Sequence, residues 1–165
     1  MSYSPIPDVL TAGRTDLGAL FRSRVQAHPE AAAVIDGDRT YTYAQLDQRS
    51  SQLANLLTQS GLIKGDRVAI LAHNCAEYIE VELAAAKTGI IVAALNWRLG
   101  DRELTHCIKL VEPKFIIAQP EFIKPLARLG LSDHVLIETG VPYEQALVEQ
   151  SDTYPTQNID PEAGL

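Results

Sequence analysis

AAAKTGIIVAALNWRLGDREL, residues 84–104, is the most informative segment of the chain. It predicts the end of an apolar helix, a stop at Gly89, a buried strand over residues 90–95, and a polar loop that opens another helix. Glycine commonly ends helices because it adopts the left-handed conformation without a Cβ clash. The continuous apolar run, rich in β-branched residues, is typical of a parallel strand covered on both faces. Residues 96–98 then follow at the carboxyl end of that strand, where open α/β sheets bind their ligands.

The same alternation of helices and strands extends in both directions from this stretch. Helices are expected from Leu17 to Pro29, from Thr42 to near Gly61, from Asn74 to Gly89, and over residues 101–111, 122–129 and 143–149. Strands are expected over residues 67–72, 90–95, 114–118 and 134–137, and residues 31–35 and 39–43 form a β-hairpin that turns on Asp36-Gly37-Asp38. Strands separated by helices predict an α/β fold with a mostly parallel sheet flanked by helices. The order of the strands in the sheet does not follow from this pattern.

The chain divides into three parts by composition. Residues 1–16 have little periodicity and are expected to form an N-terminal arm. Residues 17–149 carry the helices and strands of one α/β domain, and a chain of 165 residues is long enough to bury a core. Residues 150–165 are polar and contain prolines, so they are interpreted as a connector.

Charge and composition exclude several classes of protein. Fourteen basic and 21 acidic residues give a net charge of −7, which argues against a surface for nucleic acid or anionic membrane. No apolar stretch reaches the roughly 18 residues that a membrane span requires, and the N-terminus lacks the pattern of a secretion signal. Two cysteines, Cys75 and Cys107, fit reduced residues of a cytoplasmic protein, with a disulfide between them left open. The four histidines lack the spacing of metal ligands, and the sequence leaves open whether the chain forms a homo-oligomer.

The sequence predicts structural roles for several polar residues. Thr42 with Gln45 three residues later predicts a capping box at the start of a helix, and Asn74 is expected to cap the next helix. Glu77, Glu80 and Glu82 are expected on the solvated side of that helix, His73 is expected to face a crevice as a loop residue, and Ser50-Ser51 lies in mid-helix without a histidine to activate a nucleophile.

Four segments in a fixed order carry a family resemblance. They are Tyr41-Thr42-Tyr43-Ala44-Gln45-Leu46, then Lys64-Gly65-Asp66-Arg67-Val68-Ala69-Ile70, then Asn74, and then Lys-Thr-Gly at 87–89 with Leu-Asn-Trp-Arg-Leu at 95–99 and Arg-Glu-Leu at 102–104. Together they resemble the first core motifs of the adenylate-forming (AMP-binding) enzymes, which include acyl-CoA synthetases, luciferases and adenylation domains of peptide synthetases. The resemblance runs from about Leu17 to about Gln119. Ala94 stands where the family often has proline, which alters the stiffness of the strand and removes no chemistry.

The resemblance implies a chain that is the N-terminal part of an acyl- or aryl-CoA synthetase. Such enzymes use ATP, Mg²⁺ and CoA to convert a carboxylic acid to an acyl-adenylate and then to a thioester. Their Ser/Thr/Gly-rich phosphate loop, ending in Pro-Lys, normally follows soon after a stretch like residues 159–165, and these 165 residues contain no such loop. The chain alone is therefore expected to be inactive, to hold no catalytic residue, and to work with the remainder of a synthetase chain.

Arg98 is the one candidate ligand contact. In some CoA ligases that resemble this chain, the arginine of Asn-x-Arg lies near the CoA nucleotide, and a guanidinium suits phosphate because its planar fork donates two parallel hydrogen bonds. The alternative, which we rank ahead on sequence alone, is a structural arginine that satisfies loop carbonyls or Asp101. Asn96 is expected to bond the loop backbone, and Trp97 is expected to be partly buried.

A function of a different class also fits the sequence. Because the phosphate loop is missing, the chain could be a stand-alone, non-catalytic α/β module that binds a partner protein. The acyl substrate, fatty or aromatic, does not follow from these residues.

Overall fold

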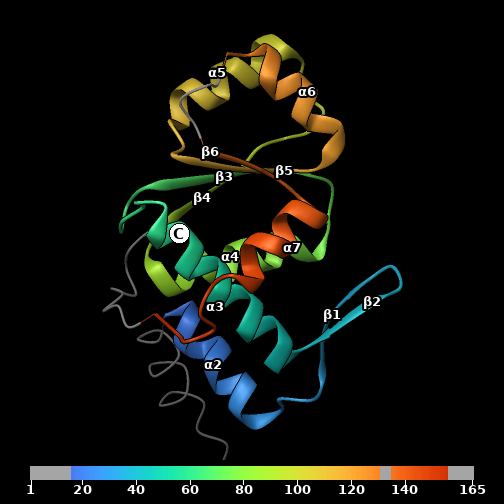
Figure 1. Ribbon diagram of the computed structural model, residues 1–165, viewed down its shortest axis with the longest axis vertical. Helices are drawn as coiled ribbons and strands as arrows, with labels where there is room; N and C mark the ends of the chain where they lie inside the picture. The colour runs from blue at the N-terminus through green and yellow to red at the C-terminus, as the bar shows by residue number, and fades with distance from the viewer. Residues whose placement is uncertain (1–15, 131–134, 156–165) are drawn as a thin grey trace, which may run out of the picture.

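Four parallel strands form the sheet that organises the molecule (Figure 1). In the computed structural model, which describes residues 16–130 and 135–155, their order is β4-β3-β5-β6. The strands are β3 (Arg67–Leu71), β4 (Ile91–Ala94), β5 (Phe115–Ala118) and β6 (Val135–Glu138). A separate antiparallel hairpin pairs β1 (Ala32–Asp36) with β2 (Arg39–Thr42). The expected parallel α/β sheet and the hairpin are both confirmed. The greater part of the predicted arm, residues 1–15, lies outside the described residues, as do residues 156–165 of the connector and His134.

Helices cover the sheet on both faces (Figure 1). The helices α3 (Tyr43–Gln59), α4 (Ala76–Thr88) and α7 (Val141–Val148) lie on one face, and α5 (Asp101–Val111) and α6 (Pro120–Arg128) lie on the other. The helix α2 (Leu17–Ala27) packs against α3 and α4, farther from the sheet.

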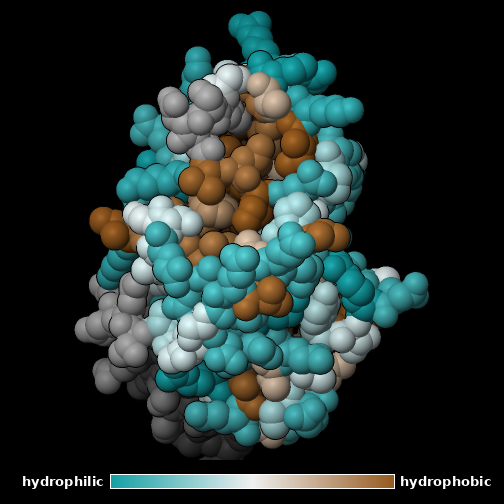
Figure 2. All heavy atoms as spheres, viewed as in Figure 1, coloured by the Kyte–Doolittle hydropathy of each residue, from teal (hydrophilic) through white to brown (hydrophobic). Residues whose placement is uncertain are grey.

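Alternate residues of the central strands supply a separate core on each face. Val68, Ile70, Phe115 and Ile117 pack with α3, α4 and α7, whereas Ala69, Leu71, Ile116 and Ala118 pack with α5 and α6. Strand side chains alternate between faces, so a continuous apolar run serves both cores. Figure 2 shows apolar side chains gathered at this level of the molecule, between the two helical layers.

The strand that the opening stretch predicted lies at the edge of the sheet. Gly89 ends α4 in the left-handed conformation (φ 71°), as predicted, and β4 pairs with β3 in parallel. The expectation that this strand is covered on both faces is wrong, because residues 91–93 are half-buried and Ala94 is exposed. Among the described residues no strand lies beyond β4, and an apolar run does not distinguish an edge strand from a central one.

The two predicted helix caps have different outcomes. Thr42 caps α3, and its capping box with Gln45 is confirmed. Asn74 does not cap α4, because Cys75 occupies the N-cap position without a side-chain hydrogen bond. The backbone N–H of Ala76 instead donates to Asp36 Oδ2 at 3.1 Å, from the end of the distant hairpin. A tertiary contact thus replaces the local cap.

The chain that follows α7 lies against α2 and α3. Asn55 Nδ2 donates to the carbonyl oxygens of Ser151 and Thr153 at 2.8 and 3.0 Å. The guanidinium of Arg22 lies 3.6 Å from the centre of the Tyr154 ring. Residues 151–155, part of the predicted connector, therefore contact the helices of the domain.

Gly18 gives Tyr154 room to pack against α2. A Cβ at position 18 would lie 2.7 Å from the Tyr154 hydroxyl oxygen and 3.3 Å from the Ala86 carbonyl oxygen. We expect Gly18→Ala to destabilise the protein by about 1–2 kcal/mol, although alanine favours helices by about 1 kcal/mol. Urea unfolding measures this change. Tyr154→Phe removes the hydroxyl and should recover most of the loss; a stabilised Gly18→Ala variant would contradict the prediction.

Candidate functional site

The carboxyl ends of the strands define the candidate site. From β3 the chain crosses through α4 to β4 at one edge, and from β4 it crosses through α5 to β5 on the other side of β3. This change of direction places a topological switch point between β3 and β5, where open α/β sheets form ligand crevices. His73 follows β3, residues 96–98 follow β4, and Gln119 follows β5, so the three loops meet at one edge.

Contacts between these loops tie the three strand ends together. Gln119 Oε1 accepts a hydrogen bond from the His73 backbone N–H at 2.7 Å. The His73 ring lies 4.3 Å from the Trp97 ring and 5.4 Å from the Phe122 ring, measured between centroids. His73 Nε2 is 3.3 Å from Glu121 Oε1. His73 therefore lies at the predicted crevice, and its ring is a contact point between the loops.

Arg98 is exposed at this edge, and its guanidinium carbon lies 4.7 Å from the centre of the Trp97 ring. Asn96 Oδ1 accepts a hydrogen bond from the Arg98 backbone N–H at 3.0 Å, which confirms the role predicted for Asn96. Trp97 is 40% exposed, so its predicted partial burial is also confirmed. Asp101, offered as an alternative partner of Arg98, instead lies 3.6 Å from Arg128. Within residues 16–130 and 135–155, Arg98 forms no ion pair with a carboxylate.

A carboxylate lies at the start of each helix that begins at this edge. Asp36 accepts from the first turn of α4, and Glu103 Oε2 accepts from the N–H of Gly100 at the start of α5 at 3.0 Å. The helix α6 begins with Pro120, which has no N–H, and Glu121. Carboxylates at helix N-termini oppose the binding of a further anion. Arg98 is therefore the group at this edge that is best suited to a phosphate.

A cavity of about 480 Å³ lies beside the loop that carries Arg98. Its lining residues are Leu99, Arg102, Glu103, His106 and Cys107.

Cys75 and Cys107 are free thiols, as expected. Burial and a hydrogen bond to Glu77 raise the pKa of the Cys75 thiol to about 12, which makes it unreactive as a nucleophile. No group of three potential metal ligands occurs among the described residues.

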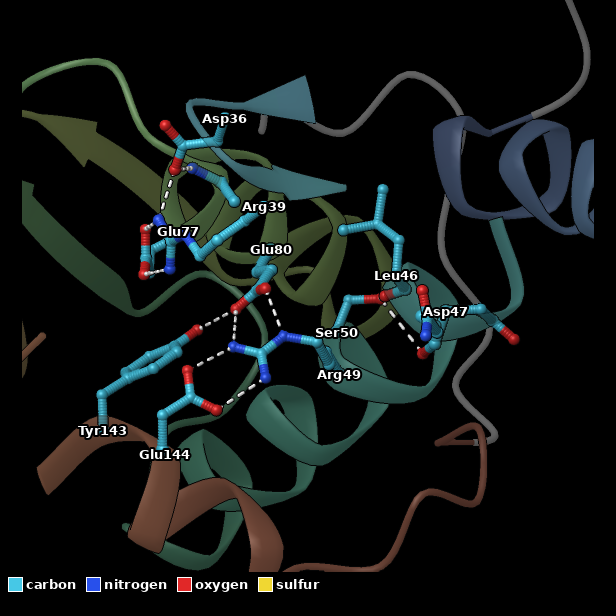
Figure 3. Close-up of polar contacts among 12 residues, drawn as sticks. Asp36, Arg39, Leu46, Asp47, Arg49, Ser50, Glu77, Glu80, Tyr143 and Glu144 are labelled. Atoms are coloured by element: carbon cyan, nitrogen blue, oxygen red, sulfur yellow. Dashed lines mark hydrogen bonds and ion pairs between the residues drawn. The ribbon is translucent and has the colours of Figure 1, made fainter. Parts of the chain in front are cut away.

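A buried ionic network joins α3, α4 and α7, and the sequence did not predict it (Figure 3). Arg49 lies between two carboxylates, with 2.5 Å from its Nε to Glu80 Oε1 and 2.7 Å from its Nη2 to Glu144 Oε1. The Tyr143 hydroxyl donates a hydrogen bond to Glu80 Oε2 at 2.7 Å. Burial would lower the pKa of Arg49, but hydrogen bonds to the two carboxylates outweigh it and raise the pKa. Burial, reinforced by Glu80, raises the pKa of Tyr143.

The prediction that Glu77 and Glu80 face solvent is therefore wrong, whereas Glu82 is exposed. Glu77 is buried against Arg39 of the hairpin, with 2.8 Å between the charged groups, and Glu80 is fully buried against Arg49. Burial raises the pKa of Glu77, but the hydrogen bonds from Arg39, the backbone and Cys75, together with the charge of Arg39, outweigh burial, so the pKa is lowered overall. Both arginines come from elements distant in sequence, so no local pattern identifies these carboxylates as paired.

Lys87 is a second buried charge that sequence reasoning missed. Its side chain is fully buried, and Nζ donates to Asp47 Oδ1 at 2.7 Å and to the hydroxyls of Ser50 and Ser51 at 2.8 Å. Ser50-Ser51, which has no catalytic partner, thus forms part of the contact between α3 and α4. The only indication of the buried Lys87 in the sequence is that this lysine ends an otherwise apolar helical stretch. These buried charges connect α3 with α4 and α7.

Comparisons with known proteins agree with the fold and the motifs. The family model of AMP-binding enzymes matches residues 21–163. A feruloyl-CoA synthase from Amycolatopsis is 35% identical over 124 residues, covering 75% of this chain and 25% of that protein. The N-terminal domain of FACL13 from Mycobacterium tuberculosis has a similar fold, with a TM-score of 0.84 at 23% identity, covering 90% of this chain and 40% of that chain. The chain spans about a quarter of the length of the curated relatives that it matches. No described helix is both long enough and apolar enough to cross a membrane.

Proposed function

Because this chain belongs to the family of AMP-binding enzymes, we propose that it is the N-terminal part of an acyl- or aryl-CoA synthetase. The enzyme activates a carboxylic acid with ATP as an acyl-adenylate and transfers the acyl group to CoA. The observation that carries this proposal is the family match over residues 21–163. The relative named as a feruloyl-CoA synthase supports a carboxylic acid as the substrate class.

Within this enzyme the chain supplies a scaffold and one phosphate contact. The central strands β3 and β5 are rigid because both of their faces are packed, and their carboxyl ends carry the loops of the crevice. Arg98 fits a phosphate of CoA, because its guanidinium is exposed at that edge and has no paired carboxylate in the described part of the chain. CoA supplies the thiol that accepts the acyl group.

The residues of this chain fit ATP and Mg²⁺ less well. Carboxylates already lie at the N-termini of α4, α5 and α6, and the sequence contains no glycine-rich phosphate loop. No group of metal ligands is present in residues 16–130 and 135–155. We therefore assign the binding of ATP and Mg²⁺ to no residue described here.

Pyrophosphate release tests the proposed function. We expect the 165-residue chain alone to release no pyrophosphate from ATP with any fatty or aromatic acid, because it lacks the loop that would hold the phosphates. The product of the whole gene should exchange pyrophosphate with ATP in the presence of its acid and form a thioester with CoA. Release by the 165-residue chain would contradict the expected inactivity. A whole-gene product that exchanges no pyrophosphate with any acid of either class would contradict the proposed function.

A further inference from the structure

The outer edge of β4 carries backbone groups that no described strand uses. The N–H groups of Ile91 and Leu95 donate inward, to carbonyl oxygens of the chain at β3, at 2.8 and 2.9 Å. Successive residues of a strand direct their N–H and C=O groups to opposite sides, so Val92 and Ala94 direct theirs outward. Within residues 16–130 and 135–155, no strand pairs with this side of β4. Val92 and Ala94 therefore offer donors and acceptors to an added strand.

The sequence of β4 does little to protect this edge. Natural proteins block edge strands with charged residues, prolines or bulges, or keep them very short. The four residues of β4, Ile-Val-Ala-Ala, include no charge and no proline, and their register with β3 runs without a bulge. Short length is thus the one protective feature of β4, and it limits an added strand to a few residues.

A cavity of about 380 Å³ lies beside the outer edge of β4. Its described lining residues are Leu17 from α2, Glu82 from α4, and Val92 and Ala94 from β4. The side chain of Leu17 is 41% exposed, and Glu82 is exposed and forms no ion pair with another residue of the described ranges. The cavity is therefore apolar with one carboxylate. Because alternate side chains of a strand face the same way, it suits an apolar side chain and a cation two residues apart.

Charge decides between the possible occupants of this surface. A second copy of the chain, paired through its own β4, would bring a second Glu82 beside the first, and each chain carries a net charge of −7. Like charges brought together in this way oppose association. A segment with a lysine or arginine instead complements Glu82 and the acidic chain.

We propose that the outer edge of β4 docks an extended segment of a partner protein that carries an apolar residue and, two residues away, a lysine or arginine. The backbone of this segment pairs with Val92 and Ala94, its apolar side chain enters the cavity beside Leu17, and its cation meets Glu82. In strand addition of this kind the main chain supplies affinity and alternate side chains supply specificity. The inference does not rest on the proposed function.

Titration with a short peptide, followed by NMR of the backbone amides, tests the docking surface. The probe is acetyl-Thr-Val-Thr-Lys-Thr-amide, in which the valine and the lysine face the same side of a strand. Only two residues of β4 pair with it, so we expect a dissociation constant on the order of millimolar. The amide signals of Val92 and Ala94 should shift in a saturable way, in the 165-residue chain and in the product of the whole gene alike.

Two variants separate the backbone contact from the charge contact. Ala94→Pro removes the outward N–H and leaves the inward bonds intact, which an edge strand tolerates, and should weaken binding by about threefold to tenfold. Glu82→Gln, on the surface of α4, should weaken it by about twofold to fivefold and tests the proposal even if Ala94→Pro disturbs the strand. Glu149→Gln, an exposed glutamate at the end of α7, is the matched control and should bind as the unchanged chain does.

The other occupants give distinct results, and each would overturn the proposal. Shifts of the same amides that depend on protein concentration without peptide would mean that a second copy docks there. Binding by the 165-residue chain but not by the whole-gene product would mean that the rest of the synthetase covers the edge. Equal binding of the peptide with glutamate in place of lysine would remove the role of Glu82, and no saturable shift at Val92 or Ala94 would remove the surface. Pyrophosphate exchange decides the proposed function separately, because none of these results depends on it.

Discussion

Arg49→Met is expected to destabilise the protein by about 3–5 kcal/mol, the largest effect of any single substitution considered. The reason is the carboxylate that it leaves behind. Glu80 is fully buried, and without Arg49 its remaining side-chain partner is the neutral hydroxyl of Tyr143. A buried charge without a counter-charge costs far more than an exposed one, because the protein interior cannot replace its hydration. The side chain of Glu144 is 43% exposed, so water can hydrate its carboxylate when Arg49 is absent.

Urea unfolding followed by circular dichroism measures this prediction, and two variants control it. Arg128→Met breaks an exposed pair with Asp101, whose side chains are 65% and 60% exposed, and should change stability by less than about 1 kcal/mol. Arg49→Met combined with Glu80→Met removes both buried charges and should recover much of the loss. If Arg49→Met is no more destabilising than Arg128→Met, the network does not hold α3, α4 and α7 together.

The parts of the fold that follow from local chemistry could be predicted from the sequence. Gly89 ends a helix because its own backbone takes a positive φ, and Thr42 with Gln45 forms a capping box within one turn. The alternation of helices with apolar strands was sufficient to predict a parallel α/β sheet. These features depend on residues that are close in the chain, so the sequence pattern contains all the partners involved.

The parts that depend on tertiary contacts could not be predicted. The run at 90–95 is as apolar as a central strand, yet β4 is an edge strand, because the crossovers place β3 and β5 at the centre. Asn74 satisfies the local rule for a helix cap, but the hairpin brings Asp36 to that position. Glu80 was expected on the solvated side of its helix, and it is instead buried beside a distant arginine that neutralises it.

The candidate site could be predicted from the sequence in part. The rule that ligands bind at the carboxyl ends of parallel strands predicts a site that includes Arg98, and the structure places Arg98 directly after β4. His73 and Trp97 also follow strand ends, and their meeting needed only the strand order. Gln119 and Phe122 follow the next strand and could have been included by the same rule. The missing information was that β3 lies between the other two strands.

Lys87→Met is expected to destabilise the protein by about 2–3 kcal/mol, the second largest effect. Methionine keeps the length of the buried side chain and removes the amine. Asp47 then loses its charged partner, and the buried hydroxyl of Ser51 loses a donor at 2.8 Å. Ser50 is less affected, because its hydroxyl also donates to the Leu46 carbonyl oxygen at 2.6 Å. Lys109→Met, on a solvent-exposed position of α5, is the matched control and should have little effect.

The pH dependence of the same variant tests whether the amine is buried as a charge. Burial lowers the pKa of Lys87, against the opposing hydrogen bond to Asp47. The unfolded chain, with a lysine pKa of about 10.4, therefore holds the proton more tightly than the folded chain. The contribution of Lys87 to stability accordingly rises with pH between the lowered pKa and about 10.4, and is flat below that window. The free energy of unfolding of the unchanged chain should therefore exceed that of Lys87→Met by a larger amount at alkaline pH. A difference that narrows there would mean that the folded state binds the proton more tightly, and that the pairing with Asp47 outweighs the effect of burial.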